Sequence, residues 1–211
     1  MNTNEGKKPF LLISLTLTAT FGGLLFGYDT AVISGAVKHL QVFFIDPLQN
    51  NAALAKSVIF EYRITICVVI LIGLILAGAI FLKLFKRIYS IILISLLTIL
   101  SGYVMFWLLD QSLIIDEGTS NSIKGFTISS ALIGCIIGGA MGGFISRSLG
   151  RKKGLIFAAL LFTLSAIGSS MPENMNIFGV EDIVSFIIYR IIGGIGVGLA
   201  SMISPMYIAE I

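Results

Sequence analysis

Hydrophobic residues occur along this chain in six long runs that contain almost no charge. The runs cover residues 9–37, 64–82, 88–109, 125–146, 154–171 and 183–207. Each run reaches about 18 residues or more, the length at which an apolar helix spans a bilayer. Only Asp29 in the first run and Arg190 in the last interrupt the apolar pattern. The pattern predicts an all-α, polytopic protein with six membrane-spanning helices.

Lysine and arginine residues gather on one of the two sides that this alternation of spans defines. Lys7 and Lys8 precede the first run, and further basic groups lie in the links at 83–87 and 147–153. The other loops carry most of the acidic residues. Four basic residues in those loops run against the pattern, namely Lys38, Lys56, Arg63 and Lys124. Because basic loops stay in the cytoplasm, both chain ends are predicted on the inner side of the cytoplasmic membrane.

The composition excludes several functional classes. Of the 211 residues, 56% are hydrophobic and only 12% are charged, about half the charged fraction of a soluble domain. The net charge of +3 is small and scattered, which argues against nucleic-acid binding. One histidine and two cysteines supply no metal-ligand set, and no nucleophile lies beside a base. We therefore expect no enzyme activity, no catalytic residue, no metal and no cofactor.

Glycines recur four residues apart in three of the runs. They are Gly23 and Gly27, Gly134, Gly138 and Gly142, and Gly194 and Gly198. This spacing lets helix backbones approach closely within a bilayer. The glycine run at 193–198 lacks the strand, the spacing and the acidic residue of a dinucleotide-binding motif, so helix packing is favoured over nucleotide binding. The runs at 64–82 and 88–109 contain few glycines and are expected to face lipid.

Asp29 and Arg190 are the ionisable residues within the spans. At a rise of 1.5 Å per residue, both lie roughly 10–12 Å below the outer surface. Their matched depth permits an ion pair that acts as a proton-responsive switch, because protonation of the carboxylate would release the guanidinium. Alternatively, Asp29 lies near the interface at a helix kink and the Arg190 side chain snorkels outward. The residues alone leave both interpretations open.

Three stretches of the chain resemble the sugar porter branch of the major facilitator superfamily. They are residues 22–30, 190–198 and 204–210, and the stretch 130–139 is also similar. The closest likeness is to bacterial D-xylose–proton symporters. The family has two six-helix halves, with the sugar bound between them.

This resemblance implies a division of the chain into three parts. Residues 1–49 would form the first family helix and the start of the outer loop. Residues 50–122 would form an inserted two-helix hairpin, and residues 123–211 would form family helices two to four, truncated after the fourth. Helices five to twelve would be missing, so we expect the chain to be inactive alone.

The resemblance also implies roles for individual residues. Asp29 matches the acid that takes the coupling proton, and Arg190 matches the arginine that pairs with it. Phe26 matches an aromatic residue near the sugar cavity. The cytoplasmic gate of the family would be formed by Gly150, Arg151, Lys152 and Glu210, with Glu210 and Arg151 as an ion pair. These residues stand at the matching positions of this chain.

The implied function is proton-coupled transport of a monosaccharide, D-xylose above all, with a hexose as the alternative substrate. The proton would be the coupling ion, and the partners would be the sugar, the lipid bilayer and the missing C-terminal helices. Two further functions stay open. One is an uncoupled sugar facilitator, in which Asp29 is only structural. The other is a structural or regulatory membrane subunit that binds a partner through its glycine faces.

Overall fold

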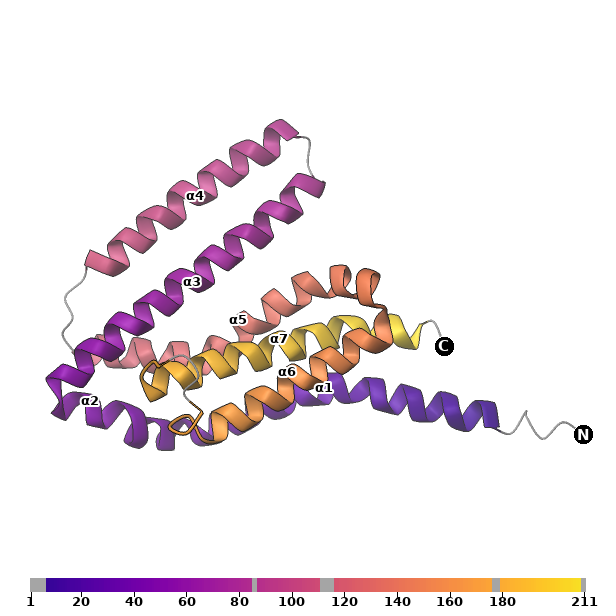
Figure 1. Ribbon diagram of the computed structural model, residues 1–211, viewed down its shortest axis with the longest axis horizontal. Helices are drawn as coiled ribbons and strands as arrows, with labels where there is room; N and C mark the ends of the chain where they lie inside the picture. The colour runs from indigo at the N-terminus through magenta and orange to yellow at the C-terminus, as the bar shows by residue number, and fades with distance from the viewer. Residues whose placement is uncertain (1–6, 85–86, 111–115, 176–178, 210–211) are drawn as a thin grey trace, which may run out of the picture.

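The chain is all-α in a computed structural model that describes residues 7–84, 87–110, 116–175 and 179–209, with some side chains of the first helix and of 84–87 excepted. No strand occurs within these residues. The elements are α1 (Lys7–Leu40), a π-helical segment η1 (Gln41–Ile45), α2 (Asp46–Asn50), α3 (Ala52–Leu84), α4 (Arg87–Asp110), α5 (Glu117–Leu149), α6 (Arg151–Ser170) and α7 (Asp182–Ile208). Figure 1 shows α1, α5, α6 and α7 as one bundle, with α3 and α4 projecting from it as a hairpin.

Five of the described helices, α3 to α7, are long and apolar enough to cross a membrane. The first predicted span falls on α1, which is helical over 34 residues, a length of about 51 Å at 1.5 Å per residue. Two helices begin well before the apolar runs from which their spans were predicted. The α3 helix begins at Ala52 and not at residue 64, and α5 begins at Glu117 and not at residue 125.

Polar caps explain these early helix starts. The Asn51 side-chain oxygen accepts hydrogen bonds from the backbone N–H groups of Ala53 and Leu54 at 3.1 and 3.3 Å. The Asp116 carboxylate accepts one from the Thr119 N–H at 2.7 Å. Such caps satisfy donors that the first helical turn leaves unpaired. Each helix therefore extends beyond its apolar run into a polar segment.

Replacing Asp116 with alanine is expected to fray the first turn of α5. Hydrogen bonds from the Thr119 hydroxyl and backbone N–H hold the pKa of Asp116 below its ordinary value. Its capping is therefore present above the ordinary pKa and lost as the pH falls through the lowered one. Amide hydrogen exchange at Thr119 and Ser120 should accelerate in Asp116→Ala. In Asp116→Asn, which keeps an acceptor oxygen, exchange should stay near the wild-type rate.

A π-helical turn and a proline end the first long helix. In a regular helix, Pro47 would clash with the carbonyl of Phe43 and leave it without a donor. The wider turn of η1 closes instead with a bond from the Asp46 N–H to the Gln41 carbonyl. The chain then forms the five residues of α2 and reverses into α3. Nothing in the apolar pattern indicated this segment.

Glycines bring the backbones of α5 and α7 into direct contact. A Cβ atom added at Gly134 would overlap the carbonyl oxygen of Ile191, and one at Gly194 would overlap that of Ala131. Gly138 and Gly198 make the same kind of approach one turn further along each helix. The close helix packing that the glycine spacing predicts is therefore confirmed for α5 and α7.

The expectation for the glycines of α1 is wrong within the described chain. No described atom outside the local helix lies within 4 Å of a Cβ built at Gly23 or Gly27. Although α1 packs along α7, these two glycines do not form the contact, because the helix presents them away from the bundle. Their spacing resembles that of Gly194 and Gly198, so spacing alone did not distinguish the two cases.

The hairpin of α3 and α4 presents an almost entirely apolar surface. Ile75, Ile99 and Phe106 are each at least 70% exposed, and α4 has its extensive described contacts only with α3. Such surface is stable against lipid and not against water. This agrees with the expected lipid-facing hairpin, except at the base of α3, which is buried against the bundle.

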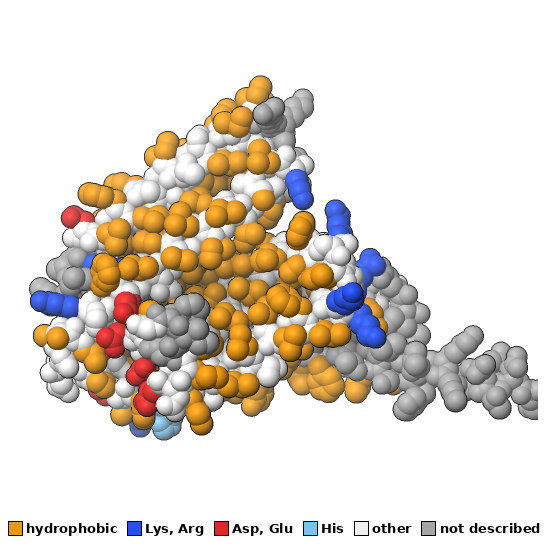
Figure 2. All heavy atoms as spheres, viewed as in Figure 1, with side chains coloured by type: hydrophobic (Ala, Val, Ile, Leu, Met, Phe, Trp, Pro, Cys, Tyr) orange, Lys and Arg blue, Asp and Glu red, His pale blue; other side chains and the backbone are white. Residues whose placement is uncertain are grey.

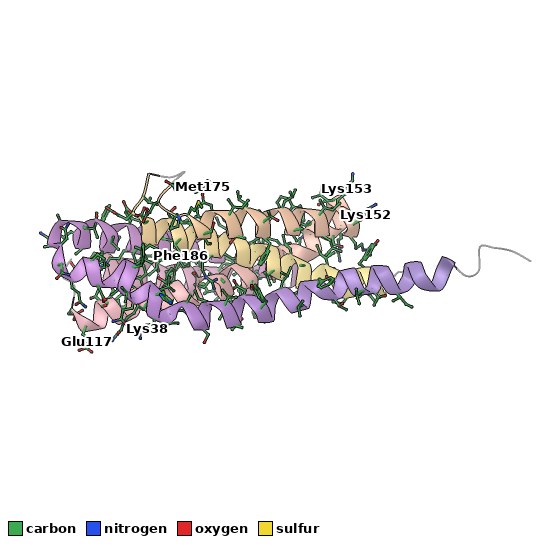
Figure 3. All side chains as sticks on the ribbon, turned by 90° about the horizontal axis from the view of Figure 1, so that it is seen from below. Lys38, Glu117, Lys152, Lys153, Met175 and Phe186 are labelled. Atoms are coloured by element: carbon green, nitrogen blue, oxygen red, sulfur yellow. The ribbon has the colours of Figure 1, made fainter. Side chains whose placement is uncertain are left out.

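Charge is separated along the long axis of the molecule. Figure 2 shows a group of basic side chains at one end of the visible face and the acidic side chains at the other end, where some basic side chains also lie. In Figure 3, Lys152 and Lys153 lie at one end, whereas Glu117 and Lys38 lie at the other. Two of the basic residues that run against the pattern lie against other parts of the chain. Lys124 donates to the Gln41 side-chain oxygen at 3.4 Å, and Arg63 is only 5% exposed.

Candidate functional site

Asp29 of α1 and Arg190 of α7 form an ion pair within the bundle. Arg190 Nη1 lies 2.9 Å from Asp29 Oδ1, and Nη2 lies 3.2 Å from Oδ2. Two parallel hydrogen bonds fix both the distance and the plane of the groups, which makes this the strongest type of arginine–carboxylate contact. The matched depth inferred from the sequence therefore corresponds to a direct contact, and the alternative of an outward-snorkelling arginine is wrong.

The two partners differ in exposure. The Arg190 side chain is 9% exposed and that of Asp29 is 29% exposed. Within the described residues, the remaining donor of the guanidinium, Nε, has no hydrogen-bond partner. The arginine is therefore the more enclosed member of the pair.

A small cavity adjoins the ion pair. Its volume is about 70 Å³, room for about two water molecules at roughly 30 Å³ each. Thr30, Cys135 and Val197 contribute to its lining together with the pair itself. The sequence did not single out Thr30 or Cys135 as site residues. Cys135 directly follows Gly134 on the helix that meets α7, and this position was the signal that could have placed it there.

The two groups of the pair balance each other's charge. A paired carboxylate and guanidinium together carry no net charge, which makes their burial tolerable in apolar surroundings. Protonation of Asp29 would remove one of the two charges and most of the attraction. The guanidinium would then be a buried cation without a counter-charge, and the local structure would have to change.

The predicted cytoplasmic motif lies at the opposite end of the bundle from the hairpin base. Gly150 joins α5 to α6 with φ +81°, a conformation that glycine adopts without the penalty of a side chain. Arg151 and Lys152 follow in the first turn of α6, both exposed. Glu210 lies outside the described residues, as does the Phe26 side chain, so the structure places neither of these predicted site residues.

Comparison with known proteins places the chain in a family. The family model described as "Sugar (and other) transporter" matches residues 15–211. The D-xylose-proton symporter of Escherichia coli (strain K12) is 38% identical over 221 residues, covering 100% of this chain and 31% of the relative. The arabinose-proton symporter of Bacillus subtilis (strain 168) is 30% identical over 199 residues, covering 94% of this chain and 25% of that protein.

The fold matches solved structures as well. The inward-open conformation of the xylose transporter XylE from E. coli has a TM-score of 0.58 at 38% identity, covering 94% of this chain and 33% of that one. The chain thus spans no more than about a third of the length of these relatives. With its bundle of apolar helices and a family match over nearly its whole length, the chain belongs to the sugar transporter family of the major facilitator superfamily.

Proposed function

We propose that this chain forms part of the N-terminal half of a proton-coupled sugar transporter in the cytoplasmic membrane. The observation that carries the proposal is the bidentate Asp29–Arg190 ion pair between α1 and α7. An ionisable pair within membrane-spanning helices is costly and is typical of proton pathways. Membership of a sugar transporter family supports a sugar as the transported substrate.

In this mechanism Asp29 is the proton carrier. A proton that enters from the outer side neutralises the carboxylate, and the two hydrogen bonds to Arg190 weaken. Arg190 then takes new partners, and α7 shifts relative to α1. Because only a differential interaction with the two states can move a conformational equilibrium, the lost ion pair supplies the bias that couples proton uptake to sugar entry.

D-Xylose is the substrate that we propose. The E. coli relative that is 38% identical over the whole chain is a D-xylose-proton symporter. The arabinose-proton symporter of B. subtilis supports a pentose more broadly. Phe26, at the position of a family aromatic near the sugar, is the contact that we assign to this chain.

We further propose that both chain ends face the cytoplasm, as the basic groups of the inner loops indicate. Gly150, Arg151, Lys152 and Glu210 would then form the inner gate. Residues 50–122 would be a lipid-facing insertion between the first two family helices. Alternating access requires two halves that rock against one another. These 211 residues would therefore transport sugar only together with the helices that the longer relatives possess.

Asp29→Asn in the intact transporter tests this function. The asparagine keeps an oxygen that accepts from Arg190 but cannot exchange a proton. We expect accumulation of labelled xylose in proteoliposomes under an imposed pH gradient to fall to the background, with exchange of internal for external xylose retained. Asp110→Asn, an exposed acid at the end of α4, is the matched control and should accumulate xylose normally.

Other outcomes of this test would contradict the proposal in distinct ways. Accumulation by Asp29→Asn at the wild-type level would show that Asp29 does not carry the proton. Wild-type uptake that an uncoupler leaves unchanged would identify an uncoupled facilitator. Accumulation by the 211-residue chain alone would contradict its dependence on further helices. A stably bound protein partner, with no effect of sugar on thermal stability, would identify a structural subunit.

A further inference from the structure

The base of the inserted hairpin is buried in a core at the outer end of the bundle. Val58, Ile59 and Tyr62 of α3 are each at most 9% exposed and pack in one hydrophobic cluster. The other members of this cluster come from the segment after α1, from α5 and from α7, and are Ile45, Leu48, Ile123, Ile183, Val184 and Ile187. We call these nine residues the outer cluster. An appendage that only faced lipid would not need such a core.

A polar contact supplements this packing at the start of α7. Glu61 Oε2 accepts a hydrogen bond from the Glu181 backbone N–H at 2.7 Å. The Ser57 hydroxyl donates to the Glu181 carboxylate, also at 2.7 Å. Glu181 is the N-cap residue of α7. Two residues of α3 therefore hold the residue at which α7 begins.

Glu61 supplies a group that α7 lacks. In a capping box, a glutamate or glutamine at the third helical position accepts a bond from the N-cap N–H. The third position of α7 is Val184, which has no acceptor. The Glu181 side chain makes no capping bond of its own. The carboxylate of Glu61, 120 residues away in sequence, accepts the bond from the N-cap N–H instead. Its negative charge also interacts favourably with the positive end of the helix dipole.

The same region connects the two helices that carry the ion pair. Ile45 and Leu48 lie on the continuation of α1, the Asp29 helix, and Ile187 lies three residues before Arg190 on α7. Phe44 and Phe186 add a ring contact between the same two elements, with centroids 5.8 Å apart. The hairpin base therefore packs against both elements that carry the ion pair, namely the continuation of α1 and the start of α7.

We propose that the base of the hairpin, residues 52–66, is a clamp that sets the position of α7 relative to α1, with Glu61 and Ser57 as positioning residues for the Asp29–Arg190 pair. This inference rests on the proposed function only for the role of the ion pair as a proton switch. The contact that it explains is the one between Glu61 and Glu181. Neither residue touches the ion pair, and their effect reaches it through the rigid first turns of α7.

Alkylation of Cys135 by a small maleimide reports on the pair, because Cys135 lines the cavity beside Asp29 and Arg190. The reporter protein is the 211-residue chain in lipid nanodiscs, with its other cysteine, Cys67, replaced by alanine. We expect Glu61→Ala to accelerate alkylation by up to about tenfold, the scale that loss of one charge-assisted hydrogen bond produces. Glu61→Gln, which keeps an acceptor oxygen, should restore a rate near that of the parent. Lys83→Ala, an exposed residue of α3 outside the clamp, should leave the rate unchanged.

Each further outcome decides for or against the clamp. Faster amide exchange at the start of α7 with an unchanged Cys135 rate in Glu61→Ala would reduce Glu61 to a local cap and overturn the inference. Equal acceleration by Glu61→Gln and Glu61→Ala would overturn the role of its hydrogen bond. If Glu61→Ala does not fold, Ser57→Ala replaces it, with an expected acceleration of about two- to threefold, and an unchanged rate there would also overturn the clamp.

The Cys135 alkylation rate of Asp29→Asn, measured in the same way, distinguishes a failure of this inference from a failure of the proposed function. Fast alkylation in Asp29→Asn but not in Glu61→Ala would contradict the clamp and leave the proton switch intact. Fast alkylation in Glu61→Ala but not in Asp29→Asn would show that the Cys135 rate does not follow the pair, and would overturn the clamp as a device that acts on the pair.

Discussion

Replacing Asp29 with alanine is expected to lower the free energy of unfolding by about 3–5 kcal/mol, the range for removing one partner of a buried ion pair. The loss follows from the enclosure of the arginine, which is 8% exposed. Without Asp29, Nη1 and Nη2 of Arg190 would lose their acceptors. Nε of the same guanidinium already lacks a partner in the described structure. Asp29→Asn should lose less, because its amide oxygen still accepts one of these bonds.

A double-mutant cycle in mixed micelles measures this coupling. Asp29→Ala combined with Arg190→Leu removes both charges, and its unfolding free energy should recover most of what the single variant lost. Lys152→Ala, at an exposed position in the first turn of α6, is the control and should change stability by less than about 0.5 kcal/mol. A double variant that is as unstable as the sum of the two single variants would show that the groups do not depend on one another.

Some features of this fold follow from the sequence because their physical signal is local and strong. An uncharged apolar run about 18 residues or more in length has few folded alternatives to a spanning helix. Two ionisable residues at equal depth in such runs have few ways to avoid the cost of burial other than pairing. The locations of the long helices could therefore be predicted. The Asp29–Arg190 contact was one of two interpretations that the residues left open, and the family roles of both residues came from resemblance.

Other features depend on contacts that no local pattern encodes. Gly27 and Gly194 stand in similar glycine spacings, yet only Gly194 meets another described backbone, because the rotation of each helix in the bundle decides which face is covered. Glu61 looked like an ordinary acidic loop residue, and its role depends on Glu181, which follows it by 120 residues. The outer cluster likewise combines four separate segments, so only the assembled bundle reveals it.

Enlarging Gly194 is expected to separate α5 from α7 and to disturb the ion pair at the same time. A Cβ atom at this position would overlap the Ala131 carbonyl oxygen and would come within 3.0 Å of the Gly134 Cα atom. Because both obstacles are backbone atoms, only a shift of a whole helix can relieve the overlap. Gly194→Ala should lower the free energy of unfolding by about 1–3 kcal/mol, and Gly194→Leu by more.

The effect on the ion pair follows from the position of Gly194 one turn after Arg190 on the same face of α7. A helix displaced at Gly194 carries the guanidinium with it, so Cys135 alkylation should accelerate together with the loss of stability. Gly102→Leu on α4 and Gly139→Leu on α5 place the same side chain where nothing described lies within 4 Å, and both should fold normally. Equal losses at Gly194 and Gly139 would show that the effect does not depend on the backbone contact, because leucine by itself favours a helix more than glycine does. A loss of stability confined to Gly194 would attribute the effect to the contact between the backbones of α5 and α7. This contact would then be what fixes the position of Arg190.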